Sequence, residues 1–236
     1  VVYVGRCLVI GHRWLGRSYM PGNKADPKVP WEPSKMFYLP KLRLAYLLTD
    51  DDRYAENVWE IVRDWAEHNP CPVGINWASP MESGIRAVNM LWAYVFTERW
   101  YNDEQKTYYL NILHTHAQYL YNFSFLEENA HNNHIYGDYS AMLHLSLFFK
   151  DAPKSWFDWA LNGLKRETRH QFLKDGTQIE GTTYYHRFVT EMLLCDLAVL
   201  LRHSIVPEKW LLRTLRMALR FIEAYTRHDG SAPIVG

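Results

Sequence analysis

From about residue 34 to the end of the chain, apolar side chains recur every three or four positions, which places them on one face of an α-helix. Met36, Leu39 and Leu42 begin this pattern, Ser34 is suited to cap the first helix, and Asp50–Asp52 are suited to cap the second. Turn residues separate the periodic segments. The pattern predicts helices over 34–49, 52–68, 81–98, 104–122, 132–149, 154–172, 183–203 and 208–227.

No segment alternates apolar and polar residues over more than a few positions, so the sequence predicts an all-α fold. Consecutive helices joined by shorter loops are typical of antiparallel helical hairpins, and such hairpins can close into an incomplete (α/α) toroid around a cleft. Pro21, Gly22, Pro27 and Pro30 interrupt the start of the chain. We therefore expect residues 1–30 to form an irregular segment packed on the body, and residues 31–236 to form the helical domain.

Composition excludes some classes of protein. Lys plus Arg and Asp plus Glu number 26 each among 236 residues, so no global charge favours binding to nucleic acid. No apolar run is long enough for a membrane span, and the 3 cysteines are too few and too widely spaced for a disulfide framework. Aromatic residues make up 15% of the chain, which suits stacking on sugar rings and equally suits packing between helices.

Two polar clusters stand at the starts of predicted helices. His131, Asn132, Asn133 and His134 precede one apolar helical run, and the cluster 182–187 (Thr-Thr-Tyr-Tyr-His-Arg) opens another. Asn, Thr and His are more often simple caps at such positions, because their side chains meet unpaired backbone N–H groups there. A helix start can also bind an anion. Since both clusters follow this pattern, we interpret the two helix starts as one site.

Several other chemistries lack the residues they need. An (α/α) toroid could be a glycoside hydrolase, which needs two carboxylates with assignable roles. No such pair emerges among the carboxylates near predicted helix starts, and Glu82 can instead form an i,i+4 ion pair with Arg86. Neither His114 with His116 nor His131 with His134 has a zinc-like spacing to further ligands. The carboxylates considered are Glu82, Glu128, Asp138, Asp175 and Glu180.

Nucleophilic catalysis has little support either. No Gly-x-Ser-x-Gly elbow occurs, no cysteine adjoins a histidine, and no phosphate-binding loop is present.

The residues that remain suit removal of a proton from the carbon beside a carboxylate. An amide or a cation that hydrogen-bonds a uronate carboxylate stabilises the anion that develops. An imidazole or a phenolate can take the C5 proton, and a phenol can give a proton to the departing glycosidic oxygen. Asn133, His134 and Tyr185 are the minimum set for this β-elimination, although Tyr184 is an alternative to its neighbour.

In the order of its motifs, the sequence resembles the helical domain of the heparinase II/III-like polysaccharide lyases. The likeness covers roughly residues 30–236. Each motif is weak alone, but their order and spacing together are fairly specific. The matching stretches are 31–35 (Trp-Glu-Pro-Ser-Lys), 80–86 (Pro-Met-Glu-Ser-Gly-Ile-Arg), 132–134 (Asn-Asn-His), 175–180 (Asp-Gly-Thr-Gln-Ile-Glu) and 184–187 (Tyr-Tyr-His-Arg).

This resemblance implies a cleft that binds an acidic polysaccharide of heparin, heparan or alginate type. It implies that Asn133 neutralises the uronate carboxylate, that His134 acts as a base or assists one, and that Tyr185 donates or shuttles the proton. Glu82 and Arg86 would shape the cleft or contact the sugar. The further substrate-binding residues implied are Asn132, Tyr184, His186 and Arg187.

The sequence departs from the family pattern in places. Lys35 and Asp138 stand where members commonly carry Arg and Glu, and the first exchange loses a bidentate fork. Members normally continue into a β-sandwich domain with further active-site residues and often a structural metal. We expect that domain to be missing here, because residues 229–236 resemble the junction just before it and both ends of the chain look cut. We therefore expect no metal or other cofactor in this chain, and the resemblance favours a periplasmic or secreted location.

Two alternatives to a lyase remain open at this point. One is a helical glycan-binding domain or inactive fragment that makes no unsaturated product. The other is a glycoside hydrolase, which ranks last because no carboxylate pair supports it.

Overall fold

The structure is a computed structural model that describes residues 26, 28–124 and 131–235. In this part of the chain the regular structure is helical, and the β pairing is limited to an isolated bridge between Phe172 and Gln178. The predicted all-α class is therefore confirmed. The chain divides into two compact units, Val1–Phe123 and Ser124–Gly236, called here unit 1 and unit 2.

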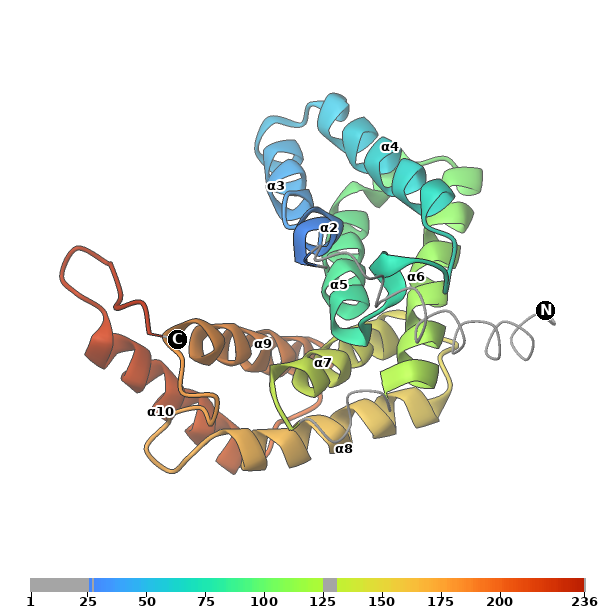
Figure 1. Ribbon diagram of the computed structural model, residues 1–236. Helices are drawn as coiled ribbons and strands as arrows, with labels where there is room; N and C mark the ends of the chain where they lie inside the picture. Colours follow the sequence, from blue (N-terminus) through green and yellow to red (C-terminus); the bar gives the residue numbers. More distant parts are fainter. Residues whose placement is uncertain (1–25, 27, 125–130, 236) are drawn as a thin grey trace. The chain divides into compact units, whose positions relative to one another are not determined.

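Unit 1 is built from successive helices that pack on their neighbours (Figure 1). Helix α3 packs against α4 and α5, and α5 packs against α6. The elements are α2 (Lys28–Ser34), α3 (Leu39–Thr49), α4 (Asp52–His68), η1 (Ile75–Trp77), α5 (Pro80–Thr97), η2 (Glu98–Trp100) and α6 (Asp103–Phe123).

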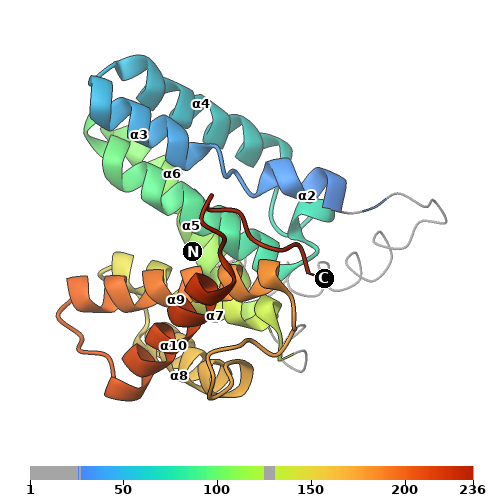
Figure 2. The same ribbon diagram turned by 90° about the vertical axis from the view of Figure 1, so that its left-hand side faces the viewer.

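Unit 2 is organised around α7 (Asn133–Phe148), which packs against both α8 (Lys154–Gln171) and α9 (Thr183–Arg202). Helix α10 (Lys209–Tyr225) packs on α9 and α8 (Figure 2). Of the 16 residues of α7, only His134, Leu147 and Phe148 are not buried. A helix that is buried around most of its circumference belongs to the core, and α7 is the core helix of unit 2.

Helices α7 and α8 approach closely at Gly163. A Cβ atom at this position would lie 2.2 Å from Cε1 of Tyr139. The Tyr139 ring fills the space that any other residue at 163 would need, so the absence of a side chain permits this approach.

The helix ranges predicted from periodicity agree with the observed ones to within a few residues, with one exception. Ser34 does not cap a helix over 34–49; it is the last residue of α2, and α3 begins at Leu39 after Tyr38. The predicted cap of the second helix is confirmed, because Asp51 accepts a hydrogen bond from the Arg53 backbone N–H at 3.1 Å. The irregular segment predicted for 1–30 lies almost entirely outside the described residues.

Within the described residues, no helix combines the length and the apolar character that a membrane crossing requires.

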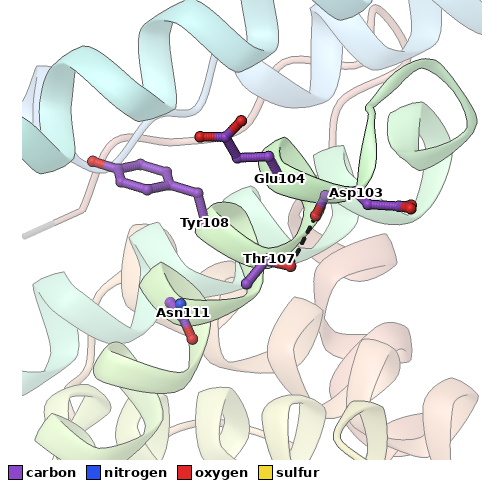
Figure 3. A pocket seen from close by; sticks show the side chains of 5 residues that line it. All are labelled: Asp103, Glu104, Thr107, Tyr108 and Asn111. Atoms are coloured by element: carbon purple, nitrogen blue, oxygen red, sulfur yellow. Dashed lines mark hydrogen bonds between the residues drawn. The ribbon is translucent and has the colours of Figure 1, made fainter.

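A surface hollow lies on one side of α6 (Figure 3). Its lining residues all come from that helix, and a hydrogen bond of 2.8 Å from Thr107 Oγ1 to the Asp103 carbonyl lies within it. No residue predicted for the site lines this hollow. The lining residues are Asp103, Glu104, Thr107, Tyr108 and Asn111.

Candidate functional site

The first polar cluster forms the start of α7, as the sequence predicts. Asn132 has an extended backbone and is the N-cap, and its Oδ1 accepts a hydrogen bond from the His134 N–H at 3.0 Å. This bond satisfies one of the N–H groups that a helix leaves unpaired at its beginning. Asn133 is the first helical residue and is only 2% exposed, whereas His134 is half-buried.

A carboxylate of the protein itself, that of Glu180, binds at this helix start. Glu180 Oε1 accepts from the Asn133 backbone N–H at 2.9 Å, and Glu180 Oε2 accepts from Asn133 Nδ2 at 2.7 Å. The negative charge is favourable at the positive end of the α7 dipole. The pattern of residues predicts an anion from a substrate at this helix start, but the backbone N–H of Asn133 already binds Glu180.

The contact also fixes the orientation of the Asn133 amide. A carboxylate only accepts hydrogen bonds, so Nδ2 of Asn133, and not its Oδ1, faces Glu180. Asn133 Oδ1 is buried and has no hydrogen-bond partner within the described part of the chain. An unpaired buried acceptor carries a free-energy penalty, which a ligand that donates a hydrogen bond would remove.

Two glutamines connect the half-buried Glu180 to the buried carboxylate of Glu167. Gln178 Nε2 donates to Glu180 Oε1 at 2.9 Å and to Gln171 Oε1 at 3.3 Å. Gln171 Nε2 in turn donates to the Asn132 carbonyl at 2.8 Å and to Glu167 Oε2 at 3.2 Å. Because both carboxylates are acceptors, each glutamine amide has one permitted orientation. The network therefore holds the start of α7 against the end of α8 and the segment that leads to α9.

The second polar cluster forms the start of α9, again as predicted. Thr182 is the N-cap, and its hydroxyl accepts from the Tyr185 N–H at 2.9 Å. Gly181 has a φ of 69°, in the left-handed region, and gives the turn that separates Glu180 from this cap. Glu180 therefore contacts the start of α7 while lying two residues before the cap of α9.

The two adjacent tyrosines differ in exposure. Tyr184 is 62% exposed and stacks on Phe188, with ring centroids 6.3 Å apart. Tyr185 is half-buried, and its ring lies edge-on to that of Tyr184, with centroids 5.4 Å apart. Tyr185 is the more constrained of the two, while its catalytic role stays a prediction.

His186 and Arg187 occupy different environments. His186 is 2% exposed, and its Nε2–H donates to the Gly176 carbonyl at 2.8 Å. Burial lowers the pKa of His186, so the ring is neutral and holds the turn before α9. Arg187 is exposed, and its Nε donates to the Thr183 carbonyl at 3.3 Å. The substrate contacts predicted for both residues stay predictions.

In unit 1, Arg86 is fully buried between two tryptophans. Its Cζ lies 4.1 Å from the centre of the Trp65 ring and 5.0 Å from that of Trp77. Arg86 Nε donates to His116 Nε2 at 3.0 Å, and Arg86 Nη2 donates to the Asn76 carbonyl at 3.0 Å. Burial lowers the pKa of Arg86 to about 9, and burial together with the Arg86 charge lowers the pKa of His116 to about 3.

Glu82 is also buried, with 5% exposure, and its Oε2 lies 3.4 Å from Lys35 Nζ. Lys35 also bonds Glu32 at 2.7 Å. Burial opposes the positive charge of Lys35, but the hydrogen bond to Glu32 and the Glu82 carboxylate prevail and raise the pKa of Lys35. Glu82 and Arg86 therefore contribute to the interior of unit 1, and their predicted contact with the sugar stays a prediction.

Sequence reasoning missed the principal contact of the site. Glu180 lies in a motif that the family resemblance uses, and it was considered among the carboxylates, but it was not chosen as a site residue. Its partner Asn133 is 47 residues away in the chain. The sequence did offer one signal. An acidic residue, Glu180, lies shortly before the helix start at Thr182, and a carboxylate there can accept hydrogen bonds from the Asn133 amide at another helix start. For Gln171 and His116, no local signal was available.

Within the ranges that the structure describes, no three His, Cys, Asp or Glu side chains gather as a metal ion would require.

Comparisons with known proteins identify the family of this chain. The family model described as heparinase II/III N-terminus matches residues 14–223. The chain belongs to this family. A comparison with curated proteins gives no match.

Solved structures share the fold of this heparinase II/III N-terminal domain. Heparinase III matches with a TM-score of 0.74 and 18% identity, over 92% of this chain and 34% of that one. The heparan sulfate lyase HepC from Pedobacter heparinus matches with a TM-score of 0.63 and 21% identity, over 94% of this chain and 35% of that one. This chain thus spans about a third of the length of these two structures. The likeness confirms the predicted helical fold.

Proposed function

We propose that this domain belongs to a polysaccharide lyase that cleaves uronic-acid-containing polysaccharide by β-elimination. Membership in the heparinase II/III family supports the class of enzyme. The similar structures are a heparan sulfate lyase and a heparinase III, and they support a sulfated uronate polysaccharide ahead of alginate as the substrate.

The observation that carries this proposal is the fixed amide of Asn133 at the start of α7. Glu180 accepts a hydrogen bond from Asn133 Nδ2 and thereby fixes the orientation of the amide. The second N–H of this amide hydrogen-bonds the uronate carboxylate and reduces the charge that disfavours removal of the C5 proton. His134, the next residue on the same helix, is half-buried and acts as the base or assists it.

The reaction consumes no water. The base removes the C5 proton, and the electrons of the C5–H bond form a C4–C5 double bond as the C4–O bond breaks. Tyr185 gives its phenolic proton to the departing glycosidic oxygen. Thr182 supports this role, because it caps α9 through the Tyr185 backbone N–H. The product is an unsaturated uronate, which absorbs in the ultraviolet.

The test is an ultraviolet assay on heparan sulfate, heparin and alginate, using wild type and Asn133→Ala. We expect Asn133→Ala to remove most of the turnover while the circular dichroism spectrum stays that of wild type. Asn162→Ala is the matched control, because Asn162 is an exposed asparagine on α8, and it should retain full turnover.

Wild-type turnover in Asn133→Ala would refute the assigned role. Binding of all three polysaccharides by wild type without any unsaturated product would identify a glycan-binding domain instead.

A further inference from the structure

The hydrogen bonds at the start of α7 involve Glu180 as closely as Asn133. Glu180 makes two of its contacts to one residue, a backbone N–H at 2.9 Å and a side-chain amide at 2.7 Å. It also accepts from Gln178 at 2.9 Å, and its own backbone N–H donates to Gln178 Oε1 at 2.9 Å. Side chain and backbone of Glu180 are therefore both held, and the carboxylate cannot turn away from Asn133 without breaking several bonds.

The geometry points to Glu180 as the positioning residue that sets the orientation of the Asn133 amide for the uronate carboxylate. This inference rests on the proposed function. Without an acceptor-only group at 180, the Asn133 amide could rotate by half a turn and present Oδ1 where its N–H is needed. A carboxylate oxygen of the substrate facing Oδ1 would meet another acceptor, and the neutralising hydrogen bond would be lost.

The charge of Glu180 gives this role a distinctive kinetic signature. Glu180 and the bound uronate carboxylate are both negative and lie on either side of one amide group, so they repel each other. Glu180→Gln removes this repulsion, which favours substrate binding, and it also removes the constraint on the amide, which disfavours the chemical step. The same change therefore affects KM and kcat in different ways, whereas general destabilisation of the fold would not lower KM.

The Gln side chain is nearly isosteric with Glu, and it can still accept the hydrogen bond from the Asn133 backbone N–H. The variant therefore keeps the contact that holds the start of α7, and we expect it to fold. A melting curve of each variant checks this expectation directly.

The first measurement does not depend on activity. In the nuclear magnetic resonance spectrum of the 28.0 kDa chain, the Asn133 side-chain amide is identified as the pair of signals lost in Asn133→Ala. We expect one of its protons to be shifted downfield by the carboxylate, and this shift to disappear in Glu180→Gln. Glu223→Gln is the matched control, because Glu223 is exposed on α10 of the same unit, and it should leave the signal in place.

The second measurement is steady-state kinetics on heparan sulfate. We expect Glu180→Gln to lower kcat by about 10- to 100-fold, the scale of a misplaced catalytic contact, with KM unchanged or lowered. Glu223→Gln should match wild type in both constants.

Each outcome decides something. An Asn133 amide signal that stays unchanged in Glu180→Gln overturns the positioning role, as does a wild-type kcat in that variant. A raised KM with an unchanged kcat assigns Glu180 to binding alone and also overturns it. If wild type shows no lyase activity on any substrate, the proposed function fails, and the amide signal still decides whether Glu180 orients Asn133.

Discussion

The buried pair of Arg86 and His116 predicts how the stability of unit 1 depends on pH. His116 is 1% exposed, its Nδ1–H donates to the Ile112 carbonyl at 2.8 Å, and its Nε2 accepts from Arg86 at 3.0 Å. Both ring nitrogens are thus used by the neutral form. Burial disfavours the charged ring, and protonation would also place a second cation against Arg86 and break the bond between them, so the pKa of His116 falls to about 3.

The sign of the effect follows from the unfolded chain, where histidine titrates near 6.5. Below that pH the unfolded state binds a proton at this histidine and the folded state does not. The free energy of unfolding therefore decreases as the pH falls, until the pH reaches about 3. The loss is about 1.4 kcal/mol per pH unit for one proton. At about pH 5, some 1.5 units below the pKa in the unfolded chain, His116 should lower the free energy of unfolding by about 2 kcal/mol relative to neutral pH.

Urea unfolding of wild type and His116→Gln near pH 7 and pH 5 measures this cost. Tryptophan fluorescence is a suitable probe, because Trp65 and Trp77 flank His116, with ring centroids 5.8 and 4.6 Å away. The variant is less stable at both pH values because packing is lost. The decisive quantity is the loss of stability between them, which should be about 2 kcal/mol smaller in the variant.

The control is His68→Gln. The Asp64 carbonyl and carboxylate raise the pKa of the exposed His68, so its contribution has the opposite sign and its removal cannot reduce sensitivity to acid. An equal loss of stability between pH 7 and pH 5 in wild type and His116→Gln would refute the assignment of a His116 that stays neutral in the folded protein.

Three further changes test the site and its support. Tyr185→Phe should reduce turnover by about 10²–10⁴, the usual worth of general acid–base help, and a loss confined to Tyr184→Phe in the same ultraviolet assay would transfer the role. Gly163→Ala places a methyl group against the Tyr139 ring and should lower the free energy of unfolding by about 1–3 kcal/mol in urea titrations; no loss would show that the ring can move. Thr182→Ala should lower the free energy of unfolding by about 1 kcal/mol in the same titrations, because it removes the cap of α9. Thr182→Ser keeps a capping hydroxyl and should retain the wild-type stability.

The sequence was sufficient where local physics decides the outcome. The range 52–68 follows from periodicity and a cap among Asp50–Asp52 from their side chains, and both agree with α4, whose N-cap is Asp51. Helix α2 was missed because Pro27 and Pro30 were taken as interruptions. Pro30 lies in the first turn of this short helix, where no N–H partner is required, and α2 continues past it and also accommodates Pro33.

The parts that sequence reasoning could not reach depend on residues far apart in the chain. Arg86 was predicted to pair with Glu82, its neighbour at i,i+4. Its ring contacts with Trp65 and Trp77 and its hydrogen bond to His116 come from other elements. Likewise, the identity of the asparagine at the start of α7 was readable, whereas the carboxylate that orients it is brought there by the turn before α9. Tertiary packing selects these partners, and no periodicity encodes them.

The burial of α7 has a consequence for the dynamics of the site. Because almost every residue of this helix is in the core of unit 2, its backbone amides should exchange with solvent only when the whole unit unfolds. Asn133 and His134 are its first residues, so the groups proposed for catalysis lie on a helix of the core. Thermal inactivation should therefore coincide with the cooperative melting of unit 2, and a bound oligosaccharide should raise both temperatures together.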